Sequence, residues 1–323
     1  MQLPRNIYEQ ESANKRNTII VMALFALFVG FLGYGFDIFY FQFGSSKGLP
    51  FPIATCSALL FGGWSGYWSL QSGAKAVLSS SGAVPVAYND PRYQVLCDVV
   101  EEMAIASGLP KPSIYVIPDP DPNAFATGKD PEHASIAVTE GLVDKLDRDE
   151  LQGVIAHEMS HVRNYDIRMM TVVAALVGAV MLLSEGALRS GRFGGRGRKS
   201  SSSGRGSGGA IILLIIWILS VVLAPIVARI LAMAVSRQRE YLADASGAEL
   251  TRNPRALASA LEKIDSAVEP TQSIKKGTAH LCIADPLGSD VNKKEGFLAE
   301  LFGTHPPISK RITLLKAMAY RYA

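Results

Sequence analysis

The segment HEMSH at residues 157–161 contains two histidines four positions apart, with a glutamate directly after the first. On a helix, side chains at positions i and i+4 project from one face about 6 Å apart, so the imidazoles of His157 and His161 can both reach one Zn²⁺ at about 2.1 Å. The Glu158 carboxylate can then act on a metal-bound water without being a ligand. This spacing predicts a hydrolytic zinc centre that needs no serine or cysteine nucleophile.

A catalytic zinc has three protein ligands and one open coordination position, so the sequence must supply a third donor. The candidates are the remaining histidines and the acidic residues of the segment SRQREYLAD, namely His133, His280, His305, Glu240 and Asp244. His161 precedes one apolar run and Glu240 follows the next one. If these runs form an antiparallel hairpin of helices, His161 and Glu240 lie about 12 and 18 Å from the membrane boundary and can meet.

From the residues alone, Glu240 is equally well interpreted as a zinc ligand or as the partner of Arg237 or Arg239 in a helical ion pair. Asp244 follows it by four positions on the same helical face. Asp244 can accept a hydrogen bond from a ligand histidine and fix its tautomer, or it can be a solvated carboxylate. His133 is expected to be a surface or packing residue, as is His280.

Four runs without Asp, Glu, Lys or Arg approach the roughly 20 residues that a membrane-spanning helix needs, in a chain whose mean hydropathy is +0.19. They are residues 17–36, 48–74, 169–184 and 206–228. The first two runs predict a retained hairpin of helices, and the basic residues before it indicate an N-terminus on the cytosolic side. The third run spans only about 24 Å as a helix, against a hydrocarbon core of about 30 Å.

The third and fourth runs are joined by a loop rich in Gly, Ser and Arg, residues 189–209. Such a composition cannot bury a core, and its positive charge opposes a position outside the membrane. Two interpretations of residues 169–228 therefore stand side by side: a second membrane-crossing hairpin, or a hairpin that does not cross.

The remaining stretches predict a mainly helical domain with a small β-sheet. Apolar spacing predicts a helix over Pro91–Gly108 that ends at the glycine. Short β-prone pieces follow at residues 113–117, 123–127 and 135–139. Asp147, with Glu150 three residues later, has the pattern of a capping box that opens the helix carrying HEMSH.

Composition excludes several classes of protein. The net charge of +3, from 32 Lys+Arg against 29 Asp+Glu, is too small to indicate nucleic acid as a partner. Cys56, Cys97 and Cys282 are odd in number and far apart, so they give no disulfide framework.

The segments HEMSHVRNYD, SRQREYLAD, PNAFATG and THPPISKRI resemble the HtpX family of bacterial membrane zinc metalloproteases, which is related to the CAAX prenyl proteases. The resemblance covers nearly the whole chain, and the long Gly/Ser/Arg loop is its main departure from the family pattern. It implies that His157, His161 and Glu240 bind one Zn²⁺ per chain and that Glu158 is the catalytic carboxylate.

The resemblance also implies a multi-pass protein of the bacterial cytoplasmic (inner) membrane with its active site on the cytosolic side. Such an enzyme cleaves membrane or misfolded proteins in quality control and the stress response, with membrane-protein substrates and the lipid bilayer as its partners. One alternative is a processing peptidase for prenylated or C-terminal peptides. The alternative from another class is a membrane adaptor braced by a structural zinc.

Two further groups of residues have a functional and a structural interpretation. His305 either donates to the oxyanion of the transition state, with Arg311 in support, or belongs to a turn before a helix. Asn123, Ala124 and Phe125 either form an edge strand that pairs with the substrate backbone, or are simply a strand after a proline-rich turn.

Together these features predict an α+β integral membrane protein with four hydrophobic helical segments and a mainly helical, zincin-like catalytic domain. The predicted parts are a cytosolic N-terminal tail (1–16), a transmembrane hairpin (17–75), the first half of the catalytic domain with the HExxH helix (76–168), a second hydrophobic hairpin (169–228) and the second half of the catalytic domain (229–323).

Overall fold

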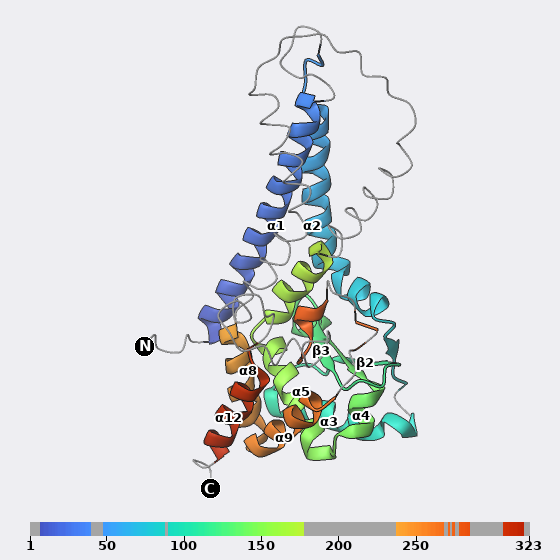
Figure 1. Cartoon of the computed structure of the whole chain (residues 1–323), viewed down its shortest axis with the longest axis vertical. Helices are drawn as coiled ribbons and strands as arrows, with labels where there is room; N and C mark the ends of the chain where they lie inside the picture. Colours follow the sequence, from blue (N-terminus) through green and yellow to red (C-terminus); the bar gives the residue numbers. More distant parts are fainter. Residues whose placement is uncertain are drawn as a thin grey trace. The chain divides into compact units, whose positions relative to one another are not determined.

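The computed structural model describes residues 7–39, 48–87, 90–177, 237–267, 271, 273–274, 278–284 and 306–319 (Figure 1). The described residues divide into two compact units. The first unit contains residues up to Thr18, Ser69–Ala175 and the described part of Ala232–Ala323, and the second contains Ile19–Trp68 and the described part of Leu176–Leu231. The chemistry predicted from the sequence lies in the first unit.

Two long helices, α1 (Ile7–Phe39) and α2 (Ile53–Ser80), contribute residues to both units. In the second unit, the buried carboxylate of Asp37 accepts hydrogen bonds from the backbone N–H groups of Ala54 and Thr55 and from the Thr55 hydroxyl. The first N–H groups of a helix have no partner within the helix. Asp37 of α1 therefore satisfies the start of α2 and ties the two helices together.

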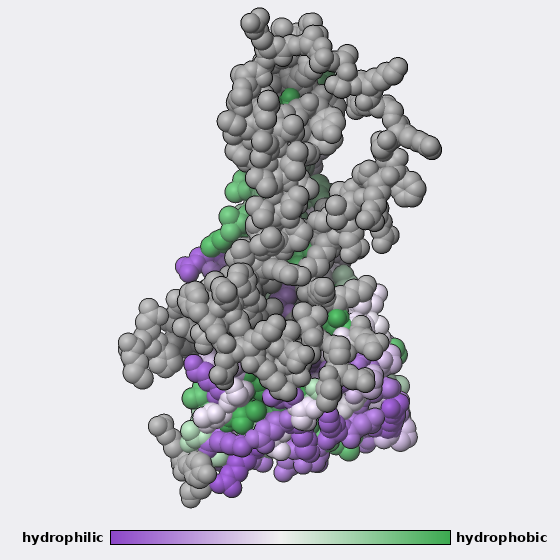
Figure 2. Space-filling model, viewed as in Figure 1, coloured by the Kyte–Doolittle hydropathy of each residue, from purple (hydrophilic) through white to green (hydrophobic). Residues whose placement is uncertain are grey.

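The segment Ser12–Gly35 of α1 has a mean hydropathy of 2.2, and in the described part of the chain α1 is the one helix long and apolar enough to cross a membrane. Its exposed side chains include Ile19 and Leu27, and Figure 2 shows a few apolar residues on the part of α1 that is in view. The apolar run 48–74 falls largely on α2. The run 169–184 is described only to residue 177, and the run 206–228 lies outside the described residues.

A mixed sheet of four strands in the order β1-β2-β4-β3 forms one layer of the first unit. β1 (Val84–Pro85) is antiparallel to β2 (Ser113–Ile117), β2 is parallel to β4 (Ser135–Thr139), and β4 is antiparallel to β3 (Ala124–Thr127). The three predicted strands are confirmed, with β3 beginning one residue later than expected. The order leaves β3 at an edge of this sheet.

The other layer is helical (Figure 1). Its elements are α3 (Gln94–Ser107), α4 (Glu140–Lys145), α5 (Arg148–Arg163), α8 (Arg237–Thr251), α9 (Pro254–Asp265) and α12 (Ile308–Ala319), with short 3₁₀ turns at Pro91–Tyr93, Pro131–His133 and Ala279–Leu281. The predicted end of α3 is confirmed, because Gly108 adopts the left-handed conformation and its N–H caps the carbonyls of Ala104 and Ile105.

The helix α5 lies at the centre of the first unit and packs against α3, α8, α9 and β3. Its start has the predicted capping box: the Asp147 side chain accepts from the Glu150 N–H, and the Glu150 side chain accepts from the Asp147 N–H. Residues 150–162 are buried except for Gln152. A helix this enclosed can carry polar side chains only where they are paired, so its histidines require partners from neighbouring elements.

One of those neighbours, α8, approaches α5 very closely. A Cβ added to Gly247 would lie 3.0 Å from the backbone nitrogen of His157 and 3.1 Å from its Cα. These are backbone atoms in the middle of a buried helix, which cannot move aside as a flexible side chain would. The missing side chain of Gly247 thus sets the distance between the helix that carries the histidines and the helix that carries Glu240.

We expect Gly247→Ala to lower the free energy of unfolding by about 1–3 kcal/mol, because the added methyl group forces the two helices apart. The measurement is the thermal unfolding midpoint of the full chain in detergent. Gly63→Ala is the control, since Gly63 is also helical but has no atom within 4 Å of an added Cβ. Equal midpoints for both variants would contradict the close approach.

Candidate metal centre

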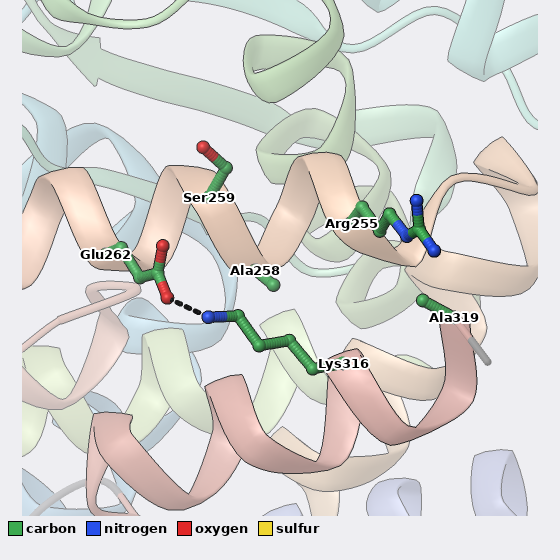
Figure 3. A pocket seen from close by; sticks show the side chains of 6 residues that line it. All are labelled: Arg255, Ala258, Ser259, Glu262, Lys316 and Ala319. Atoms are coloured by element: carbon green, nitrogen blue, oxygen red, sulfur yellow. Dashed lines mark hydrogen bonds and ion pairs between the residues drawn. The ribbon is translucent and has the colours of Figure 1, made fainter.

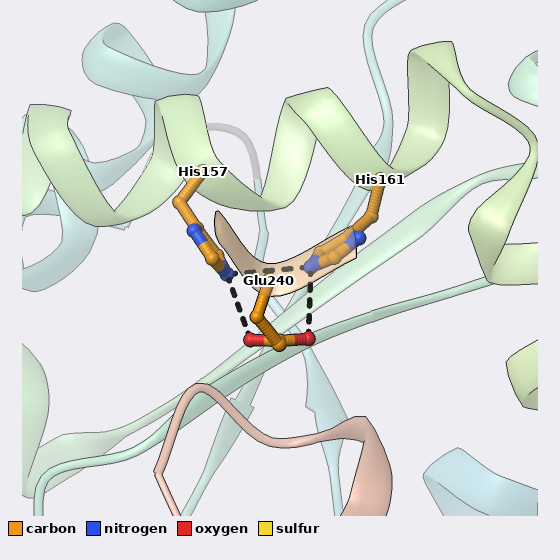
Figure 4. A group of neighbouring side chains, drawn as sticks. All are labelled: His157, His161 and Glu240. Atoms are coloured by element: carbon orange, nitrogen blue, oxygen red, sulfur yellow. Dashed lines mark hydrogen bonds and ion pairs between the residues drawn. The ribbon is translucent and has the colours of Figure 1, made fainter. Parts of the chain in front are cut away.

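The side chains of His157, His161 and Glu240 converge on one point between α5 and α8 (Figure 4). The two Nε2 atoms of the histidines are 3.3 Å apart. Oε2 of Glu240 lies 3.7 Å from Nε2 of His157, and Oε1 lies 3.6 Å from Nε2 of His161. All three residues are buried. The structure thus brings together the two histidines of the motif and a carboxylate from a distant part of the sequence.

These distances fit a single divalent metal ion. Ligand atoms held about 2.0–2.1 Å from a tetrahedral ion are about 3.3–3.4 Å from one another, close to the separations between the three residues. Two imidazole nitrogens and one carboxylate oxygen are also donors that suit zinc and related transition metals.

Each imidazole is oriented from behind by a carboxylate. Oδ1 of Asp244 lies 3.0 Å from Nδ1 of His157, and Oδ2 of Asp166 lies 3.1 Å from Nδ1 of His161. A carboxylate at Nδ1 favours the tautomer with its proton there and leaves the lone pair of Nε2 for a metal. With both protons at Nδ1, the two lone pairs would face each other and repel, and a cation between them would remove this repulsion.

The surrounding charges favour a cation in the same place. Burial lowers the pKa of His161, but the Asp166 hydrogen bond and the nearby Glu240 and Glu158 more than offset it, so that the pKa is raised to about 9. Without a metal, a proton on His161 supplies the positive charge. A divalent ion at the same position would displace that proton.

Arg311 of α12 completes the arrangement around Asp244. Its guanidinium group is fully buried and donates to both Asp244 oxygens, at 2.8 Å from Nε and 2.7 Å from Nη2. Nη1 donates to the carbonyl of Ile283 at 2.7 Å and lies 3.6 Å from Oε2 of Glu240. Burial raises the pKa of Asp244, but Arg311 outweighs it and the pKa falls to about 2. Asp244 is therefore a fixed negative charge at neutral pH.

Glu158 lies on the same helix as the histidines and is 1% exposed. Burial raises its pKa, and the charge of Glu240 adds to this, while the two imidazoles oppose it. Its Oε2 makes no hydrogen bond to any described residue. A buried carboxylate oxygen without a partner, next to three potential metal ligands, is suited to accept a proton from a bound molecule.

Asn123, Ala124 and Phe125 lie at the beginning of β3, and the chain itself pairs with them. The Ala124 carbonyl accepts from the N–H of Ile283, Phe125 forms a bridge with Cys282, and the Asn123 amide donates to the carbonyl of Ala284.

Of the other predicted candidates, His305 lies outside the described residues. His133 is exposed and pairs with Asp130, while His280 is buried with Nε2 3.2 Å from the Met170 carbonyl. Neither of these two histidines joins the cluster.

The sequence does not predict the roles of two residues of the site, Asp166 and Arg311. Asp166 is part of the HEMSHVRNYD segment, but it lies beyond the turn that ends α5, where helical periodicity cannot assign it to a face. The sequence suggests Arg311 only as support for His305, whereas in the structure its guanidinium group donates to Asp244. An arginine in a helix with apolar neighbours was the available signal for a buried cation.

The described surface also has a groove between α9 and α12, lined by Arg255, Ala258, Ser259, Glu262, Lys316 and Ala319 (Figure 3). An ion pair between Lys316 and Glu262 crosses it. None of the cluster residues lines this groove, so the chemistry is assigned to the buried cluster.

The site has two histidines and a glutamate on one buried helix and a carboxylate from a second helix. This arrangement defines a metallopeptidase of the HExxH class. The chain belongs to peptidase family M48, whose profile matches residues 92–319. The predicted relationship to the HtpX family is confirmed by the curated proteins it resembles. The protein is therefore a hydrolase of peptide bonds with a metal cofactor.

Three of these relatives are described as protease HtpX homologs. That of Caldanaerobacter subterraneus subsp. tengcongensis is 45% identical over 317 residues, which cover 97% of this chain and 98% of the relative. That of Dictyoglomus turgidum is 40% identical, covering 99% and 97%, and that of Ligilactobacillus salivarius is 39% identical, covering 97% and 100%. The crystal structure of S. mikatae Ste24p aligns with 78% of this chain and 58% of its own, at 21% identity and a TM-score of 0.43.

We expect Arg311→Met to lower the free energy of unfolding by about 3–5 kcal/mol, because the Asp244 carboxylate is then buried without its partner. The thermal midpoint of the purified chain measures this effect. Lys316→Met on the same helix removes an exposed ion pair and should cost at most about 1 kcal/mol. If the two variants unfold at the same temperature, the buried pair does not stabilise the site as described.

Proposed function

We propose that this protein is an integral membrane zinc endopeptidase in which His157, His161 and Glu240 hold the metal and Glu158 is the catalytic carboxylate. The observation that carries the proposal is the convergence of the three donor side chains beside a buried carboxylate with an unused oxygen. A bound zinc would act as a Lewis acid on the scissile carbonyl and on the attacking water. The protein's own side chains transfer the protons and orient the metal ligands.

Glu158 takes a proton from the attacking water and delivers it to the leaving amine. Its raised pKa supports this role, because a carboxylate that binds protons more readily is a better base for the attacking water. Asp244 and Asp166 keep the Nε2 atoms of the two histidines directed at the metal. No covalent intermediate with the protein is formed.

An extended substrate would add to β3, which is an edge strand of the sheet and packs against α5. Recognition through the backbone requires little of the substrate sequence, which suits an enzyme that removes many different damaged proteins. At Ala124 and Phe125 the edge is paired with Ile283 and Cys282, so a substrate must use the rest of the edge or replace this segment.

We further propose that the protein is anchored in the bacterial cytoplasmic membrane by several spans, with the metal on the cytosolic side, and that it cleaves membrane or misfolded proteins. The apolar segment of α1 and its exposed side chains support the anchor. Three basic residues precede or begin that segment, Arg5, Lys15 and Arg16, and support a cytosolic N-terminus.

Replacing Glu158 with Gln should reduce the kcat for cleavage of an unfolded protein by at least about 10³-fold, because the amide cannot accept the proton of the attacking water. Zinc content should remain that of the parent. The matched control is Glu132→Gln, the same change on an exposed residue, which should leave the rate unaltered. Unimpaired cleavage by the Glu158→Gln variant would refute the mechanism.

Metal analysis of the detergent-purified chain should give one zinc per chain, and a chelator should abolish proteolysis until zinc is added back. Glu240→Ala should lose most of the bound zinc, because only two donors of the cluster remain. Retention of a full equivalent of zinc by that variant would show that Glu240 is not a ligand.

A further inference from the structure

The turn that follows α5 determines where the Asp166 carboxylate points. α5 ends at Arg163, Asn164 caps it, and a new helix begins at residue 166. Between them, Tyr165 has a φ of 57°, a left-handed conformation that is uncommon for a large side chain. A turn of this kind persists only when its surroundings hold it, so the orientation of Asp166 depends on contacts from outside the turn.

Those contacts come from α1, about 150 residues earlier in the sequence. The side-chain amide nitrogen of Asn14 donates to the carbonyl of Asn164 and to Oδ1 of Asp166, both at 2.8 Å. The two amide protons of Asn14 are thus both used on this turn, and the side chain is 6% exposed in total. The next residue, Lys15, places its Nζ 4.6 Å from the centre of the Tyr165 ring.

The two oxygens of Asp166 have different partners. Oδ2 faces Nδ1 of His161, while Oδ1 is held by Asn14 and lies 3.4 Å from Nη1 of Arg239. A carboxylate held at one oxygen can rotate little at the other, so its distance and angle to the histidine are fixed. Arg239 supplies charge at longer range, whereas the short directional bond comes from Asn14.

We propose that Asn14 is a positioning residue for the metal centre, which acts on His161 through Asp166 and makes the start of α1 part of the support of the site. This inference rests on the proposed zinc site. It assigns α1 a second role, because the same helix contains the apolar segment Ser12–Gly35. The anchor helix then contributes to metal affinity as well as to attachment.

Zinc affinity of the full chain in detergent tests the proposal, measured by competition with a chromogenic chelator after removal of bound metal. Asn14→Leu removes both hydrogen bonds while keeping the same number and branching of side-chain heavy atoms, and should weaken zinc binding by about 10–100-fold. Asn17→Leu, the same change at a half-buried position on the same helix, should stay within about twofold of the parent. Equal dissociation constants for the two variants would overturn the proposal.

A double-variant cycle separates positioning from a general loss of stability. Asp166→Asn should also weaken zinc binding, and the combination with Asn14→Leu should lose little more than the worse single variant, because both act through one contact. If the fold-losses in zinc affinity of the two single variants multiply in the double variant, Asn14 acts elsewhere and the proposal is overturned. The visible absorption of bound Co²⁺ should change in both single variants and stay unchanged in Asn17→Leu.

If Asn14→Leu is not recovered folded, Asn14→Ser serves in its place, since its hydroxyl group is too short to hold both acceptors. It too should weaken zinc binding, and an unchanged dissociation constant would count against the proposal. Failure of the proposed function has a different signature: the parent chain itself would bind no zinc. The two failures are therefore distinguishable in one titration.

Discussion

The structure of the first unit depends on a concentration of negative charge around two imidazoles. Among the described residues, four carboxylates surround the imidazoles, and they outnumber the guanidinium groups that pair with them: Glu158, Glu240, Asp244 and Asp166 against Arg311 and Arg239. When all four carboxylates are ionised, two negative charges remain, which is the charge that a divalent cation neutralises. Burying ionised groups is unfavourable unless they are paired, so Asp244 and Asp166 have partners from neighbouring elements, whereas Glu158 keeps one oxygen without a partner among the described residues.

Local sequence predicted the elements well because the signals are local. The capping box at Asp147, the glycine that ends α3 and the β-prone pieces each act within a few residues, and all are present in the structure. The two histidines could likewise be assigned to one helical face by their spacing alone. For these features the sequence contains the whole physical argument, and folding does not override it.

The rest of the site could not be derived in this way. Glu240 was ambiguous between a ligand and an ion pair until the family resemblance was considered, because its neighbours Arg237 and Arg239 offered an ordinary alternative. Asp166 depends on a left-handed turn, and Arg311 on the packing of α12 against α8. Asn14 is some 150 residues from its partners. Such contacts exist only in three dimensions, and spacing along the chain carries no trace of them.

Ile283 connects the candidate metal centre to the edge strand β3 through its backbone hydrogen bonds. Its N–H donates to the Ala124 carbonyl of β3, and its own carbonyl accepts from Arg311. Arg311 in turn donates to Asp244, which lies behind His157. A change at Ile283 therefore affects both the edge of β3 and the guanidinium group of Arg311. The backbone pairing of β3 and the surroundings of the His157 imidazole are thus linked through a single residue.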